Sequence, residues 1–236
     1  MRAAEVLKQA LGAFGGSETV TPATPAEMEA LSERLGGSIP DELRELLSIA
    51  TGLTIDSEGL GFGIELDFLG GIEGQEWPNA FRSSFHFGHD GCGNSWLIEL
   101  PPAADGAGAR LGPVLFSSHD PPFIAIQATD LASFLAEVVR PESEDDGEAE
   151  ERPLGTQMPL EDVSVPLTAD GARADADLSG VLKDLPAGTR VADLRARRVG
   201  TGFACDMSDP ESQLRRLGSD LVWAITPRRR RFFGRG

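Results

Sequence analysis

The sequence has few cysteines, few basic residues and no long apolar run. Only two of its 236 residues are cysteines, Cys92 and Cys205, and they lie far apart. So few cysteines exclude a disulfide-stapled extracellular scaffold and favour a reducing compartment, so we expect a cytoplasmic protein. No window approaches the roughly 18 apolar residues of a membrane span. Residues 1–16 lack the continuous apolar run of a signal peptide, so none is expected.

Positive charge is also scarce. The chain holds 21 basic and 38 acidic residues, for a net charge of −17, and five arginines fall in the last nine residues. Such an acidic body repels nucleic acid and anionic membranes and attracts basic proteins. We therefore predict a protein partner, with a basic toxin domain as one candidate, and no nucleic-acid or membrane partner. The alternative is that the acidity serves only solubility.

Helical patterns fill most of the first 52 residues. Residues 3–14 carry apolar side chains at helical spacing, which predicts a short amphipathic helix. For the next helix, Thr24 can act as N-cap, Pro25 occupies the first helical position and Glu27 completes a Thr-x-x-Glu capping box. A third helix is expected over 38–52, because a proline lies in its first turn and a glycine ends it.

The clearest strand pattern is a β-hairpin over 81–100. Phe81, Phe85 and Phe87 share one strand parity, which is typical of a half-buried strand. Residues 90–94 hold the Asp, Gly and Asn that favour a turn, and the alternation resumes after them. Further strands are expected at 62–69, 113–117 and 123–128, followed by a helix at 131–140.

Composition changes at residues 141–152, PESEDDGEAEER, which hold seven acidic residues and almost nothing apolar. We interpret this stretch as an acidic linker between a domain at 1–140 and a small α+β unit with a basic tail at 153–236. The fold class is α+β, with N-terminal helices packed on a mostly antiparallel sheet. In the C-terminal unit, strands are expected at 163–167, within 190–206 and at 221–226, and helices at 178–185 and 210–217.

One cluster of residues could carry chemistry. His86, His89 and Cys92 follow a His-x2-His-x2-Cys spacing, and zinc could use two imidazoles and a thiolate. Cys92 beside His89 could also act as a nucleophile. The simpler interpretation is one strand histidine facing solvent and one turn histidine, because the two histidines differ in strand parity. We therefore predict no catalytic residue, no metal and no cofactor.

An ordered set of motifs resembles a known family. It begins with the helix Ile39-Pro40-Asp41-Glu42-Leu43 and includes the turn from Gly88 to Asn94, the strand from Trp96 to Leu100 and Gly112-Pro113-Val114-Leu115. It closes with the helix from Leu131 to Leu135. Over about residues 24–140, the chain resembles the SUKH superfamily (Smi/Knr-like domains). The resemblance implies a non-enzymatic α+β binding domain. Bacterial members are often immunity proteins that neutralise a cognate toxin, frequently a nuclease or nucleic-acid deaminase, and yeast relatives regulate cell-wall signalling.

Together these observations predict an immunity-type protein whose acidic face covers the basic active site of a toxin. The alternative is a regulatory or scaffold protein of the same fold without a toxin partner, and a third is a metal- or thiol-dependent enzyme at the histidine–cysteine cluster. We expect the contact surface to use acidic side chains beside strands and loops, with one aromatic anchor. The predicted partner-binding residues are Asp56, Glu58, Glu65, Asp67, Glu73, Glu76 and Trp77.

Overall fold

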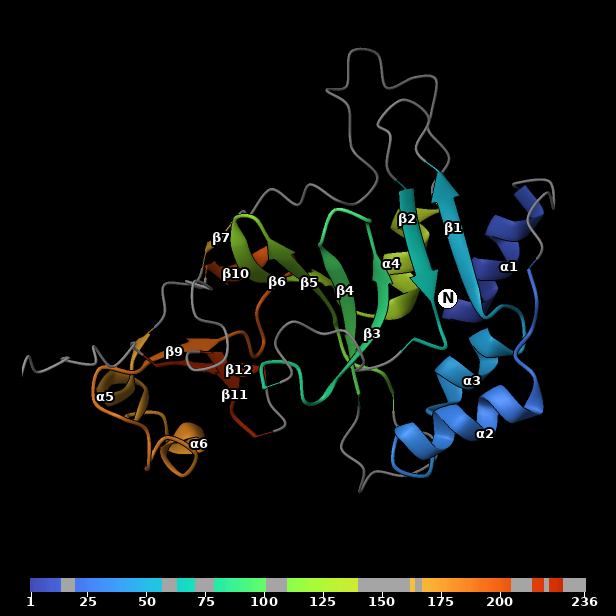
Figure 1. Cartoon of the computed structure of the whole chain (residues 1–236). Helices are drawn as coiled ribbons and strands as arrows, with labels where there is room; N and C mark the ends of the chain where they lie inside the picture. The colour runs from blue at the N-terminus through green and yellow to red at the C-terminus, as the bar shows by residue number, and fades with distance from the viewer. Residues whose placement is uncertain are drawn as a thin grey trace, which may run out of the picture.

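The structure is a computed structural model that describes residues 1–13, 20–56, 63–70, 79–100, 110–139, 162–163, 167–204, 214–218 and 221–226. Within these residues, helices combine with one large, mostly antiparallel sheet and one smaller sheet (Figure 1). The predicted α+β fold class is therefore confirmed. We call residues 1–139 the N-terminal unit and residues 162–226 the C-terminal unit. The predicted division of the chain into two domains stays a prediction, because the linker lies outside the described residues.

The N-terminal helices form where capping residues and apolar spacing agree. Thr24 and Glu27 make both hydrogen bonds of the predicted capping box, and Asp130 accepts a hydrogen bond from the Ser133 backbone at the start of the last helix. The third helix is shorter than predicted, because the chain turns after Leu47 and soon enters a strand. The helices of this unit are α1 (Ala3–Ala13), α2 (Pro25–Arg34), α3 (Asp41–Leu47) and α4 (Leu131–Val138).

The large sheet combines strands from both units. Among the described residues it has eight strands in the order β1-β2-β3-β4-β5-β6-β10-β7. Neighbours pair antiparallel, except β10 with β7. The strands are β1 (Gly52–Asp56), β2 (Gly63–Asp67), β3 (Ser84–His89), β4 (Ser95–Glu99), β5 (Val114–His119), β6 (Pro122–Ala128), β7 (Asp162–Val163) and β10 (Thr201–Ala204).

The predicted hairpin is β3 and β4. Its turn is organised by Asp90, whose carboxylate accepts hydrogen bonds from the backbone N–H groups of Cys92 at 2.8 Å and Asn94 at 3.1 Å. Gly91 and Gly93 adopt φ values of 70° and 94°, which side chains disfavour. The sequence therefore fixes this turn locally.

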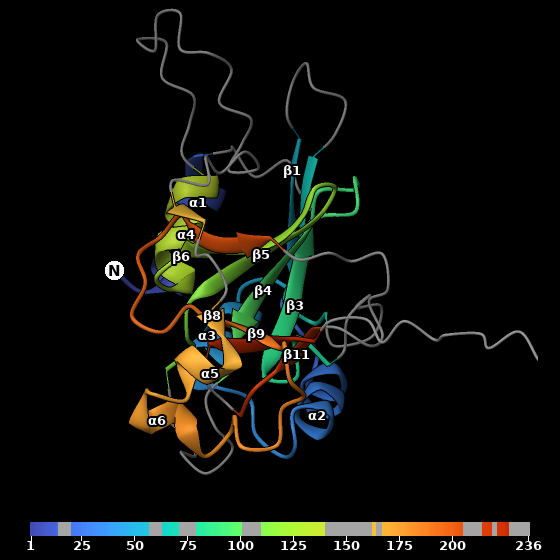
Figure 2. The ribbon, with the colours of Figure 1, turned by 90° about the vertical axis from the view of Figure 1, so that its left-hand side faces the viewer.

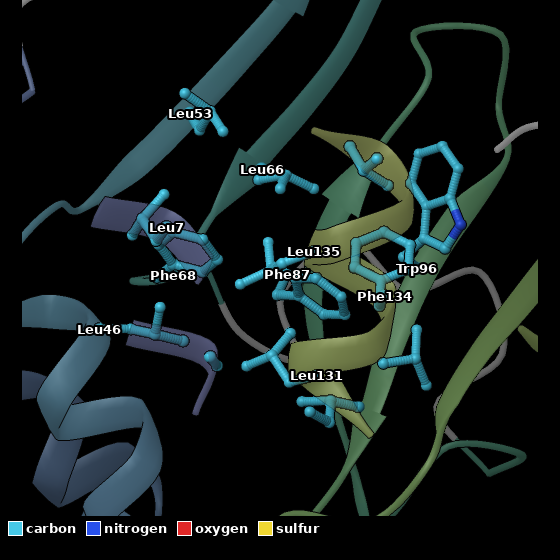
Figure 3. Packing of buried hydrophobic residues seen from close by; sticks show 14 of the residues in the cluster. Leu7, Leu46, Leu53, Leu66, Phe68, Phe87, Trp96, Leu131, Phe134 and Leu135 are labelled. Carbon is cyan, nitrogen blue, oxygen red and sulfur yellow. The ribbon is translucent and has the colours of Figure 1, made fainter. Parts of the chain in front are cut away.

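Helices α1 and α4 cover one face of the large sheet (Figure 2). Figure 3 shows Phe87 and Trp96 packed around Phe134 of α4, with ring centroids 5.3 Å and 5.9 Å from Phe134. Leu66 from β2 and Leu53 from β1 extend the same core. We call this side of the sheet the helix face and the opposite side the outer face.

The C-terminal unit forms a second sheet with the order β11-β12-β9-β8. One side of this sheet packs on the outer face of the large sheet, and the other side packs on two short helices. The strands are β8 (Leu167–Thr168), β9 (Arg190–Asp193), β11 (Leu214–Arg216) and β12 (Val222–Ile225), and the helices are α5 (Ala169–Ala172) and α6 (Ala176–Ser179).

Two helix predictions in the C-terminal unit are wrong. Residues 214–216 form strand β11 instead of the end of a helix at 210–217, whose earlier part lies outside the described residues. In β11, Leu214 and Arg216 are buried and Arg215 is exposed, which is the alternation of a strand. The helix expected at 178–185 is replaced by α6, which ends at Ser179, and by turns that follow it.

Candidate functional site

The outer face of the large sheet is covered over β4, β5 and β6. Leu97, Leu115 and Ile126 point away from the helices and are buried against the C-terminal unit. The shared core also takes Phe81 from the segment before β3. The C-terminal residues in this core are Ala192, Leu194, Phe203, Leu214, Trp223 and Ile225.

A buried ion pair lies at the edge of this shared core. Both guanidinium Nη atoms of Arg216 in β11 donate to the Glu99 carboxylate in β4, one at 3.0 Å, and the two residues are 4% and 5% exposed. The Ser84 hydroxyl also donates to Glu99. The Arg216 guanidinium lies 4.5 Å from the ring centroid of Trp223, whose indole N–H donates to the Ala80 carbonyl at 2.8 Å. These contacts join residues 117 and 143 positions apart in the chain.

The same face over β1, β2 and β3 is polar. Along β2, Ile64 and Leu66 are buried on the helix face, whereas Glu65 and Asp67 are exposed on the outer face. In β3, the side chains of Phe85 and Phe87 enter the helix-side core and that of His86 lies on the opposite side. We call the side chains on this side of the three strands that are at least partly exposed the open outer face, which consists of Thr54, Glu65, Asp67, His86 and His89.

Strand register brings these residues together. Glu65 lies between Thr54 of β1 and His89 of β3. The Glu65 Oε2 atom is 3.4 Å from His89 Nε2; the Glu65 side chain is exposed and that of His89 is partly exposed. The carboxylates of β2 therefore lie beside the imidazoles of β3, where each can change the electrostatic field at the other.

His86 is the more enclosed of the two histidines. Burial lowers the pKa of His86 below its ordinary value, and the neighbouring His89 acts in the same direction. A hydrogen bond with the Gly88 backbone and the charge of Asp67 oppose this shift without outweighing it. Within the described part of the chain, the buried Nε2 atom of His86 has no hydrogen-bond partner. The imidazole therefore favours its neutral form.

The structure describes only part of the predicted partner-binding set. Glu65 and Asp67 are exposed on β2 as expected of contact residues. Asp56 is the last residue of β1, but its side chain is not among those that the structure describes. Glu58, Glu73, Glu76 and Trp77 lie outside the described residues. Whether these residues bind a partner stays a prediction.

The residues of the histidine–cysteine cluster lie on strand β3 and in the turn that follows it. Among the described residues, no group of three or more His, Cys, Asp and Glu side chains is arranged to hold a metal ion. Cys92 is exposed in the turn, and the His119 ring packs on Gly93, where an added Cβ would lie 2.8 Å from Nδ1. A β-bulge between His86 and Gly88 changes the local register of β3.

Sequence reasoning missed that the two histidines share a face with the acidic residues. It treated His86 and His89 as candidate metal ligands and the carboxylates as a separate group. The available signal was the order of the strands, because β2 precedes β3 and antiparallel neighbours often follow one another in the chain. The bulge, which determines which side chains face outward, has no comparable signal in the sequence.

Comparison with known proteins agrees with the architecture. The SMI1 / KNR4 family (SUKH-1) matches residues 22–137, which run from just before α2 to the end of α4. No curated protein matches the sequence. Among the described residues, no helix combines the length and hydrophobicity that a membrane crossing requires. Domains of this family are generally non-enzymatic. Residues 22–137 of the chain form a domain of the SMI1/KNR4 family (SUKH-1).

Proposed function

We propose that the protein is a cytoplasmic, immunity-type binding protein that neutralises a cognate toxin through its open outer face. The observation that carries the proposal is the contrast within one sheet face. The part over β4–β6 is occupied by the C-terminal unit, and the part over β2 and β3 presents exposed carboxylates. A partner that uses this sheet face therefore meets Glu65 and Asp67 first.

Charge supports a basic partner. Residues 1–140 hold 20 acidic and 7 basic residues, whereas residues 153–236 hold 11 acidic and 13 basic ones. The negative charge is therefore concentrated on the unit that carries the open outer face. An enzyme that cuts or edits nucleic acid needs a positively charged cleft, and an acidic protein can occupy that cleft in place of the nucleic acid. Such attraction speeds association and weakens with salt.

The proposed contact surface extends beyond the described side chains. Asp56 ends β1 and Glu58 follows it in the sequence, and Glu73, Glu76 and Trp77 follow β2. Carboxylates at these positions would add to the charge of Glu65 and Asp67. Trp77 would supply the aromatic anchor that protein interfaces often centre on.

The test is a pull-down from the native cell lysate with the full chain as bait. The lysate is applied at low salt, and bound proteins are eluted with stepwise increases in salt. We expect capture of a basic protein with nuclease or deaminase activity, which the purified chain then inhibits in a direct assay. Capture of signalling or envelope proteins without such activity would contradict the toxin and favour a regulatory role.

Two matched variants locate the surface. Glu65→Lys with Asp67→Lys changes two charges on β2, and Glu29→Lys with Glu33→Lys makes the same change at exposed positions of α2. We expect the β2 variant to lose inhibition and the α2 variant to retain it. Equal loss in both variants would show that net charge, rather than the open outer face, controls the interaction.

A further inference from the structure

Two histidines lie among the carboxylates of the open outer face. His89 contacts Glu65 across the β2–β3 pair at 3.4 Å. His86 lies on the same side of β3 and is influenced by both Asp67 and His89. The β4 residues paired with these histidines, Leu97 and Ser95, are uncharged. Of the two strands paired with β3, β2 therefore supplies the charged side chains beside the histidines, and the Gly91 backbone N–H in the following turn donates to His89 Nδ1 at 3.3 Å.

We propose that His86 and His89 make the open outer face a pH-dependent binding surface, which binds a basic protein at neutral pH and releases it in mild acid. This inference rests on the proposed function, because it concerns the same surface. It adds a regulatory property that the acidic residues alone do not provide.

Protonation changes the surface in two ways. Each protonated imidazole adds a positive charge beside Glu65 or Asp67, which lowers the attraction for a cationic partner. A protonated His89 also forms an ion pair with Glu65 and occupies a carboxylate that a partner arginine would otherwise contact. Both effects weaken binding as pH falls, so they act in one direction.

The two imidazoles differ in their surroundings. His89 is partly solvent-exposed, lies beside the Glu65 carboxylate and accepts a hydrogen bond from the Gly91 backbone N–H at Nδ1. The His86 ring is more enclosed, and its cation would carry a proton on a buried nitrogen or disturb the hydrogen bond with Gly88.

The experiment measures the affinity of the full chain for a fluorescent nona-arginine peptide between pH 7.5 and 5.5. Arginine stays charged throughout this range, so the change in affinity reports the protein. We expect binding to weaken about tenfold in wild type, from positive charge added at short range to the carboxylates. The double variant His86→Asn/His89→Asn should lose most of this pH dependence, whereas His119→Asn should keep it.

The outcomes separate this inference from the proposed function. If the Glu65→Lys/Asp67→Lys variant binds nona-arginine as tightly as wild type at pH 7.5, the open outer face is not the cationic surface. If that variant loses binding but the histidine double variant keeps the full pH dependence, only the inference about the histidines is overturned. NMR provides a second measurement, because the peptide should shift the ring resonances of His86 and His89 and leave those of His119 unchanged.

Discussion

The outer face of the large sheet presents two different surfaces side by side. Over β4–β6 its side chains are apolar and buried beneath the C-terminal sheet. Over β2 and β3 they include the exposed carboxylates of Glu65 and Asp67, the partly exposed ring of His89 and the more enclosed ring of His86. Because both surfaces belong to one sheet, the comparison separates the part of the face that completes the fold from the part that carries exposed charge.

The covered surface shows how closely the two units are joined. Strand β10 continues the large sheet beyond β6, and the second sheet fills the outer face with Trp223 and its neighbours. Burial of apolar surface from both units stabilises them together. The C-terminal unit therefore completes the core on the outer face of the N-terminal unit.

The largest effect is expected from breaking the buried ion pair. Arg216→Met leaves the Glu99 carboxylate buried without its charged partner, so we expect a loss of about 3–5 kcal/mol in the free energy of unfolding. Urea denaturation followed by circular dichroism measures it. Arg215→Met changes the exposed neighbour on the same strand and should alter stability by less than about 0.5 kcal/mol. Equal stabilities of the two variants would contradict the role of the pair.

A second test separates the desolvation cost of an unpaired buried charge from the cost of poor packing. In the double variant Glu99→Leu/Arg216→Met, both charges are replaced by apolar side chains of similar length. We expect it to recover most of the stability that Arg216→Met loses, because the unpaired buried carboxylate is gone. If the double variant is as unstable as the single one, packing rather than charge dominates the contact.

An intermediate effect is expected at the junction of the two units within the large sheet. In Gly202→Ala, the added Cβ would lie 2.6 Å from the Ile124 carbonyl oxygen and 2.7 Å from the Ala125 Cβ. We expect a loss of about 1–3 kcal/mol and faster amide hydrogen exchange in β6. Gly180→Ala, which meets nothing within 4 Å, is the matched control. Unchanged exchange in β6 would argue against the β6–β10 pairing.

The smallest effect concerns the open surface. Because the pKa of His86 is lowered in the fold, the unfolded chain binds a proton there more readily than the folded one does. Stability from this group is fully present above about pH 6.5 and falls as pH decreases toward the lowered value. His86→Asn should remove this acid-side loss in urea denaturation at several pH values. His119→Asn should retain the acid-side loss of stability. If His86→Asn loses as much stability in acid as the wild type does, His86 is not the source of the loss.

Local sequence signals predicted the N-terminal unit better than the C-terminal one. The capping box at Thr24 and the Gly-rich turn at Asp90 depend on residues a few positions apart, and both formed as expected. Strand β1 was missed because Gly52 fits the end of a helix as well as the start of a strand. Strand β11 was missed because its partners are distant, with Arg216 reaching Glu99 across 117 positions.

The candidate site was likewise predicted only where its signal is local in the sequence. Alternation along β2 predicts that Glu65 and Asp67 face away from Ile64 and Leu66, as the structure shows. That this side also carries His86 and His89 depends on the register of β2 with β3 and on a bulge. That the neighbouring part of the face is covered depends on a separate sheet about 100 residues away in sequence.

The most direct test of the shared core is to cut the chain between the units. A protease site inserted within residues 141–152 allows cleavage of the folded protein, which is then analysed by gel filtration at about 0.5 M salt to screen attraction between exposed charges. The shared core predicts that both fragments elute together at the volume of the intact protein and separate only in denaturant. Separation in native buffer, with each fragment keeping its own secondary structure, would contradict it.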